Sequence, residues 1–134
     1  MKNPERQEIR AILDRSKRIA VVGLSDNPYR TSYQISKVML EAGYDIIPVN
    51  PTVEQVFDIP AVDSLKDIEG HIDIINVFRR SEFLKGVAEE AAQVDADVFW
   101  TQLGLVSEDA YDIAVNAGMT VIMDRCIKVE HAIA

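Results

Sequence analysis

The segment Ile19-Ala20-Val21-Val22-Gly23-Leu24-Ser25-Asp26-Asn27-Pro28-Tyr29-Arg30-Thr31-Ser32 sets the architecture that we predict for the whole chain. Its first residues form a short apolar run rich in valine, which is typical of a strand buried on both faces. The run ends at Gly23 in a polar turn, and residues 35–42 then place apolar side chains at helical spacing. Strand, glycine turn and helix begin a mononucleotide-binding βαβ unit, in which the N-terminus of the helix suits a phosphate.

Composition limits the classes of function. The chain has 134 residues, of which 48% are hydrophobic and 27% charged, as in an ordinary globular domain, and we expect residues 1–134 to form a single domain. A net charge of −8 argues against broad binding to nucleic acids or anionic membranes. The same net charge is compatible with a small anionic ligand, because a helix N-terminus and one arginine can attract an anion locally.

The ends of the chain and its cysteine content favour a cytoplasmic protein. The first residues contain no apolar core of a signal peptide, and no apolar run approaches the ~18 residues of a membrane span. Cys126 is the single cysteine, so the chain has no internal disulfide and fits a reducing compartment.

Alternating patterns predict an α/β fold, a mostly parallel sheet of five or six strands with helices on both faces. We expect strands over residues 18–22, 45–49, 72–78, 97–101 and 120–123, and helices over 4–16, 31–43, 81–92 and 107–118. Asn3, Ser81 and Ser107 are predicted to cap three of these helices. Residues 64–68 are expected to form one helical turn, and residues 52–63 a short third strand or an irregular segment.

Ligands of such sheets bind outside the carboxyl ends of the strands. The residues there are polar or conformationally special, whereas the strand bodies are apolar, and this contrast predicts a binding cleft. The strand ends concerned are residues 23–25, 50–51, 78–80, 100–104 and 125–126.

The usual nucleotide fingerprints are missing. A dinucleotide site needs G-x-G-x-x-G after the first strand and an acidic residue at the end of the second. Here Gly23 is followed by Leu24 and Ser25, and the second strand ends in Val49-Asn50-Pro51, so NAD is disfavoured. The P-loop pattern G-x-x-x-x-G-K-[ST] is also absent. The loop instead offers serine, threonine and arginine donors, which suit a phosphorylated nucleotide with more negative charge than NAD.

Several motifs taken together resemble the small stand-alone CoA-binding proteins, which are similar to the N-terminal domain of the succinyl-CoA synthetase α subunit. The resemblance covers residues 18–131, and residues 54–61 depart from the family pattern. The motifs that carry it are Ile19–Ser25, Asn27-Pro28, Arg30–Tyr33, Gly43-Tyr44, Ile47–Pro51, Asp73 with Asn76–Arg79, Trp100–Gly104 and Asp124–Cys126.

The resemblance implies coenzyme A as the ligand and assigns provisional roles to the strand ends. The turn that contains Gly23 and Ser25, together with Arg30 and Ser32, would hold the pyrophosphate or the adenosine phosphate. The adenosine would be bordered by Val49, Asn50 and Pro51, and the cleft flanked by Phe78 and Arg79. The pantetheine end would be lined by Trp100, Gln102 and Gly104.

Several of these residues also have an ordinary structural explanation, and the sequence carries no catalytic motif. Trp100 is more often a core residue, Asn50 can hold a turn with Pro51, and Cys126 is more often a small buried hydrophobe. No catalytic triad, carboxylate pair or metal-ligating cluster stands out in the sequence.

We therefore expect CoA or acyl-CoA binding without catalysis of its own. The alternatives are a subunit or relic of an acyl-CoA synthetase or reductase system, and a thiol-redox protein that forms a mixed disulfide with CoA at Cys126.

Overall fold

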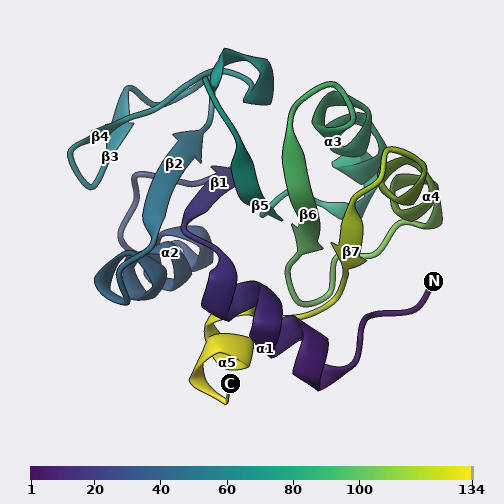
Figure 1. Cartoon of the computed structure of the whole chain (residues 1–134). Helices are drawn as coiled ribbons and strands as arrows, with labels where there is room; N and C mark the ends of the chain where they lie inside the picture. The colour runs from purple at the N-terminus through teal and green to yellow at the C-terminus, as the bar shows by residue number, and fades with distance from the viewer. Residues whose placement is uncertain (134) are drawn as a thin grey trace.

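The structure, a computed structural model, describes residues 1–133 and is built on one five-stranded sheet (Figure 1). The strands lie in the order β2-β1-β5-β6-β7, and each neighbouring pair is parallel. This arrangement confirms the predicted α/β, Rossmann-like fold. The strand bounds are β1 Arg18–Val22, β2 Asp45–Val49, β5 Ile72–Val77, β6 Ala96–Thr101 and β7 Thr120–Ile122.

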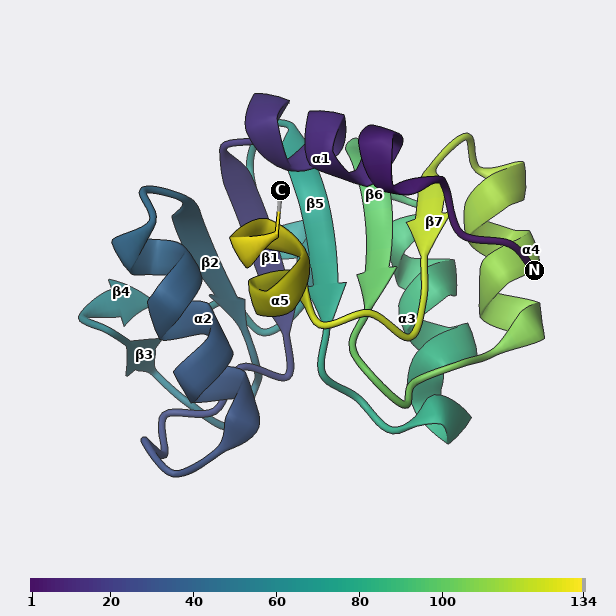
Figure 2. The same cartoon turned by 90° about the horizontal axis from the view of Figure 1, so that it is seen from below.

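Helices cover both faces of the sheet (Figure 2). One face carries α1 (Arg6–Arg15), α2 (Thr31–Glu41) and α5 (Ile127–Ala132), and the other carries α3 (Leu84–Ala91) and α4 (Glu108–Asn116). Successive residues of a strand point to opposite faces, so β1 contributes to both cores. Ile19 and Val21 pack with the first helix layer, whereas Ala20 and Val22 pack with the second. No helix among the described residues is long and apolar enough to cross a membrane.

The strand order creates a switch point between β1 and β5. The chain leaves β1 to form α2 and β2 on one side, whereas β5, β6 and β7 extend the sheet on the other side. Connections that depart in opposite directions leave a crevice at the carboxyl ends of these two strands. Backbone hydrogen bonds join β1 to its two neighbours at the carboxyl edge of the sheet. Gly23 N–H donates to Val49 O at 2.9 Å, and Phe78 N–H donates to Val22 O at 2.8 Å.

Residues 52–63 do not add a third strand to the main sheet. They form a small antiparallel hairpin of β3 (Gln55–Val56) and β4 (Ile59–Pro60), which lies beyond β2 in Figure 1. Its two turn residues, Phe57 and Asp58, adopt left-handed backbone angles, with φ of 55° and 60°. Two consecutive positive φ values match the right-handed twist of a hairpin. The predicted helical turn is present as η1 (Leu65–Asp67).

Two of the predicted helix caps are wrong and one is confirmed. The side chain of Asn3 exchanges two 2.8 Å hydrogen bonds with the backbone of Met123, so it ties the N-terminus to the end of β7 instead of capping α1. Ser81 lies in η2 (Ser81–Phe83), and its hydroxyl accepts from Val106 N–H. Ser107 caps α4 by accepting from Ala110 N–H at 3.1 Å. Helix α5 was not predicted from the sequence.

Candidate functional site

The N-terminus of α2 lies at the carboxyl edge of the sheet (Figure 2). A cleft lies at the same edge. It consists of two adjoining lobes that share Gly23, Arg30, Phe78, Arg79 and Arg80. The β2-side lobe, of about 680 Å³, is also lined by Asn50, Pro51, Thr52 and Phe83. The β6-side lobe, of about 410 Å³, is also lined by Thr31, Ser32, Ile35, Gln102, Leu103, Leu105 and Cys126. Both volumes fall in the range of small-molecule sites.

Gly23 is required at the floor of the cleft by two features of the backbone. Its φ of +86° lies in the left-handed region, where a side chain is strained. A Cβ at this position would also lie 2.6 Å from the carbonyl oxygen of Phe78. The glycine therefore lets the end of β1 pass against the end of β5 and leaves backbone exposed to the cleft.

The N-terminus of α2 has the features of an anion site. Its N-cap residue is Arg30, no side chain caps it, and its first turn contains no acidic residue. The first N–H groups of a helix have no partner within the helix, and they carry the positive end of its dipole. Thr31 and Ser32, from this first turn, line the β6-side lobe.

Side chains of the β1–α2 loop fix its conformation. Ser32 Oγ accepts from Ser25 N–H at 3.0 Å, Ser25 Oγ accepts from Asn27 N–H, and Asn27 Oδ1 accepts from Tyr29 N–H. Ser25 therefore supports the loop and does not line either lobe. The loop presents Arg30 to the cleft from a preorganised backbone.

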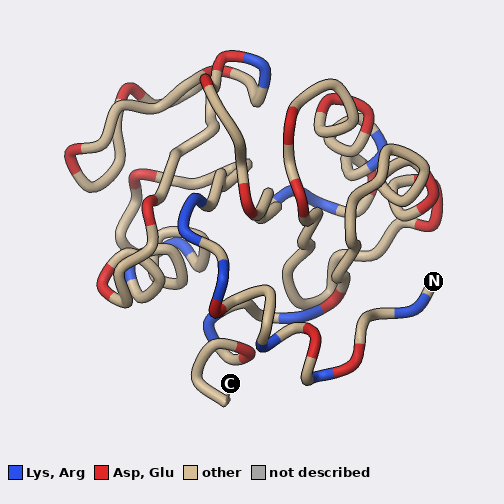
Figure 3. Tube along the Cα trace, in the orientation of Figure 1, with Lys and Arg blue, Asp and Glu red and all other residues tan. Residues whose placement is uncertain are grey.

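Three arginines concentrate positive charge in the cleft. Arg79 and Arg80 form the basic stretch of the loop that follows β5 (Figure 3). Their guanidinium carbons lie 4.7 Å and 5.5 Å from the ring centroid of Phe83, a cation–π arrangement that orients both side chains. Arg80 is further paired with exposed Glu82 at 3.4 Å, whereas Arg30 and Arg79 form no ion pair within residues 1–133.

Asn50 and Gln102 line the cleft while they hold neighbouring segments together. Asn50 Nδ2 donates to Leu24 O at 3.0 Å, and its Oδ1 accepts from both the N–H and the hydroxyl of Thr52. Gln102 Nε2 donates to Asn76 Oδ1 at 2.6 Å, and its Oε1 accepts from Ile127 N–H at the start of α5. Each amide therefore has a structural role beside any contact with a ligand.

The structure brings most of the predicted site residues to the cleft. Those that line it are Gly23, Arg30, Ser32, Asn50, Pro51, Phe78, Arg79 and Gln102. The predicted residues that do not line it are Ser25, Val49, Trp100 and Gly104.

Trp100 and Val49 lie inside the core, and Gly104 lies outside the cleft. Trp100 is completely buried among the side chains beneath α1, α2 and α5, and its indole N–H donates to Arg125 O at 2.8 Å. Val49 is also buried. Gly104 forms a left-handed turn whose N–H donates to Asp124 Oδ1, so it joins the ends of β6 and β7.

The sequence did not single out several residues that line the cleft. Arg80 and Leu103 lie within the predicted strand ends and Thr31 is the threonine donor of the predicted loop, but none of the three was assigned to the ligand. Ile35 and Phe83 reach the cleft only because α2 and η2 begin at its rim. Cys126, which the sequence favours as a buried hydrophobe, is half-buried and lines the β6-side lobe.

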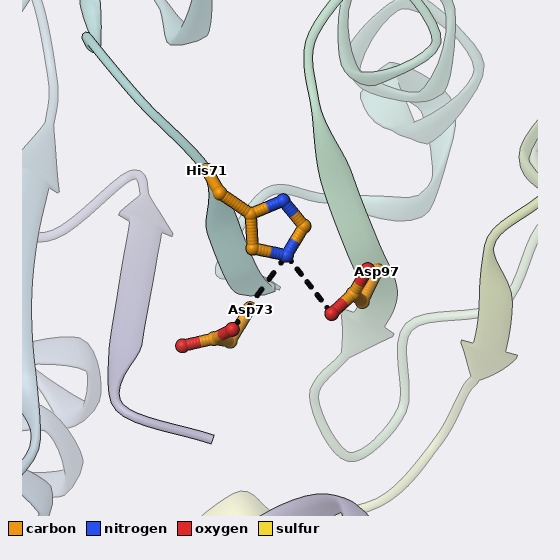
Figure 4. A group of neighbouring side chains, drawn as sticks. All are labelled: His71, Asp73 and Asp97. Carbon is orange, nitrogen blue, oxygen red and sulfur yellow. Dashed lines mark hydrogen bonds and ion pairs between the residues drawn. The ribbon is translucent and has the colours of Figure 1, made fainter. Parts of the chain in front are cut away.

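A second group of side chains gathers at the opposite, amino edge of the sheet (Figure 4). His71 Nε2 lies 2.9 Å from Asp97 Oδ2 and 3.6 Å from Asp73 Oδ1, and His71 Nδ1 lies 2.9 Å from Asp95 Oδ2. Hydrogen bonds to Asp97 and Asp95 raise the pKa of His71 to about 9. A protonated ring donates from both nitrogens, so this group forms an ion-pair cluster remote from the cleft.

Asp73 also holds the start of β1. Its Oδ2 accepts from Lys17 N–H at 2.8 Å and from Arg18 N–H at 2.9 Å. Burial alone would raise the pKa of Asp73, but these N–H groups and the nearby charges of His71 and Arg18 outweigh it, so the pKa lies below its usual range. This carboxylate therefore stabilises the sheet.

Comparisons with known proteins agree with the fold and identify the family. A family model described as a CoA binding domain matches residues 17–132. Uncharacterized protein YneT of Bacillus subtilis (strain 168) is 62% identical over 133 residues, which cover 99% of this chain and 98% of that protein. A solved structure described as a hypothetical protein from Pyrococcus horikoshii OT3 superposes with a TM-score of 0.93 at 32% identity and covers 98% of this chain and 95% of that one.

A larger enzyme subunit contains a related segment. The α subunit of acetate–CoA ligase (ADP-forming) II from Pyrococcus furiosus is 27% identical over 120 residues, which span 81% of this chain but 26% of that subunit. The similarity therefore covers about a quarter of the ligase subunit. Because the family model spans nearly all of residues 1–134, the chain belongs to the CoA binding domain family.

Proposed function

We propose that this chain is a single domain that binds coenzyme A in the cleft at the carboxyl edge of the sheet, without catalysis of its own. The observation that carries the proposal is the uncapped N-terminus of α2 beside Arg30 and Arg79 at the switch point. Backbone N–H groups and guanidinium forks are the donors that phosphates prefer. Membership of the CoA binding domain family supports CoA as the phosphate-bearing ligand.

The two lobes suggest how CoA lies in the cleft. The phosphates occupy the shared centre, where Gly23 exposes backbone and Arg30, Arg79 and Arg80 converge. The adenosine occupies the β2-side lobe, beside Pro51 and the ring of Phe83. The pantetheine arm then extends into the β6-side lobe.

The same geometry favours CoA over NAD. NAD sites place a carboxylate at the end of the second strand to bind the ribose hydroxyls. Asn50 stands at that end, and its amide is engaged by Leu24 and Thr52. CoA carries a 3′-phosphate in place of a free ribose hydroxyl, and this extra negative charge matches an arginine-rich centre.

Titration calorimetry with CoA, dephospho-CoA, NAD and ATP tests the proposal. CoA is expected to bind most tightly, and dephospho-CoA more weakly because it lacks the 3′-phosphate. Tighter binding of NAD or ATP than of CoA, or no heat of binding with CoA, would overturn the proposal.

The position of Cys126 in the β6-side lobe favours one secondary candidate, thiol exchange with CoA disulfide. The Cys126 thiolate would attack one sulfur of CoA disulfide, form a protein–CoA disulfide and release one CoA thiolate. Intact-protein mass spectrometry after incubation with CoA disulfide would show this adduct, and Cys126→Ser serves as the control.

A further inference from the structure

The walls of the two lobes differ in chemistry. Beyond the shared centre, the β2-side lobe adds two polar side chains, Asn50 and Thr52, and two apolar ones, Pro51 and Phe83. The β6-side lobe adds the apolar side chains of Ile35, Leu103 and Leu105 and the thiol of Cys126, besides the polar Thr31, Ser32 and Gln102. The β2-side end of the cleft is therefore mixed in character, whereas the β6-side end exposes mainly apolar surface.

Two buried polar side chains of the β6-side lobe already have hydrogen-bonding partners within the protein. Gln102 donates to Asn76 and accepts from Ile127 N–H, and the Ser32 hydroxyl accepts from Ser25 N–H. Gln102 and Ser32 are also buried, at 4% and 7% exposure. A ligand group that fills the far part of this lobe finds mostly hydrocarbon and few free hydrogen-bonding partners.

Leu103 stands out on the rim of this lobe. It is 70% exposed, although it precedes a turn that is fixed by Gly104, whose N–H donates to Asp124 Oδ1. Leu103 therefore exposes apolar surface at the mouth of a largely apolar lobe, and covering this surface with a hydrocarbon group removes it from water, which is favourable.

The shared centre determines what kind of molecule fits both lobes. Its arginines attract phosphates, and the apolar lobe begins directly beside them, because the two lobes share Gly23, Phe78 and Arg79. A single ligand that fills the cleft therefore combines an anionic nucleotide with an apolar tail.

From this we infer that the preferred ligand is an acyl thioester of CoA whose linear hydrocarbon chain, of four carbons or more, covers Leu103 and Leu105 in the β6-side lobe. This inference rests on the proposed binding of CoA. It adds that the site distinguishes acyl-CoA from free CoA and from acetyl-CoA, whose short acyl group buries little surface. The hydrocarbon chain of the ligand needs no hydrogen-bonding partner, which agrees with a lobe in which the Gln102 amide is already bonded to Asn76 and Ile127.

Calorimetric titrations with CoA, acetyl-CoA, butyryl-CoA and hexanoyl-CoA at one ionic strength test the inference. Affinity is expected to rise with chain length, by up to about fourfold for each methylene that becomes fully buried. The Leu103→Ser variant is expected to flatten this increase, measured relative to its own affinity for CoA. Val115→Ser removes another exposed apolar side chain, from α4 and outside the cleft, and is expected to keep the wild-type increase.

The outcomes separate this inference from the proposed function. If CoA binds and the acyl chain adds no affinity, the acyl preference is refuted and CoA binding stands. If affinity rises with chain length equally in wild type and Leu103→Ser, the assignment of the chain to the β6-side lobe is wrong. If neither CoA nor any acyl-CoA binds, the proposed function itself fails.

Discussion

Replacing Gly23 by alanine tests whether close passage of β1 and β5 builds the cleft. The new methyl group would lie 2.6 Å from Phe78 O, and real Cβ atoms essentially never approach closer than 3.0 Å. The Phe78 carbonyl must therefore shift, although Phe78 N–H is anchored to Val22 O at 2.8 Å. The variant is thus expected to strain the floor of the cleft as well as its own backbone.

The expected loss has two parts. A non-glycine residue in the left-handed region costs about 1–2 kcal/mol. Forcing a methyl group into packed surroundings costs about 1–3 kcal/mol more. The sum, about 2–5 kcal/mol, is a large share of the free energy of unfolding of an ordinary domain, about 5–15 kcal/mol.

Gly118 provides a matched control. Its φ is +90°, close to that of Gly23, but a Cβ there meets no atom within 4 Å. Gly118→Ala should therefore lose only the conformational part, about 1–2 kcal/mol. Urea denaturation followed by circular dichroism measures both variants, and equal losses in the two would refute the close-passage argument.

Three further predictions concern the cleft centre, the N-terminus and the amino edge of the sheet. Arg30→Ala should weaken CoA binding by about 1–3 kcal/mol, the value of a charged hydrogen bond, whereas Arg10→Ala on α1 should not; equal effects in calorimetry would remove Arg30 from the site. Asn3→Ala should lower the free energy of unfolding by about 1–2 kcal/mol because two hydrogen bonds to the end of β7 are lost, and an unchanged urea midpoint would contradict this. Folding raises the pKa of His71 from 6.5 to about 9, so the protonated ring stabilises the folded state. This stabilisation is fully present below about pH 6.5 and is lost as the pH rises toward about 9. Wild type should therefore lose more stability than His71→Asn between pH 6 and pH 9.5, and parallel losses would show that the Asp97 contact has no such effect.

The parallel sheet could be predicted because its signals are local. Apolar runs such as Ile19–Val22 and the left-handed glycines after helices, such as Gly43 and Gly118, fix strand and helix limits independently of tertiary contacts. The strand-end rule then located the cleft without knowledge of the strand order. The fold class therefore followed from the hydrophobic pattern of the sequence, and the place of the cleft followed from the rule that ligands bind at the carboxyl ends of parallel strands.

The errors arise where tertiary contacts override local signals. Helix α5 has six residues and no side-chain cap, and it is stabilised by docking Ile127 on the sheet and by Gln102. The hairpin turn uses Phe57 and Asp58 in place of the glycine that usually marks such turns. The strand was correctly predicted to reach Thr101, but Trp100 was assigned to the pantetheine end of the ligand, whereas the alternation of β6 turns its indole into the core.

The amino-edge cluster could not be seen in the sequence because it depends on strand register. Ile72 is paired with Ala96 and Ile74 with Val98, which brings Asp73 and Asp97 side by side across two strands. Only this pairing places both carboxylates around His71.

The most direct test of the central claim is an amide-resolved NMR titration of the chain with CoA. Binding at the carboxyl edge predicts the largest shift changes at the amides of Gly23, Arg30, Arg79 and Gln102, with little change at His71. Shift changes that gather around His71, or that leave the four cleft amides unmoved at saturating CoA, would contradict the account.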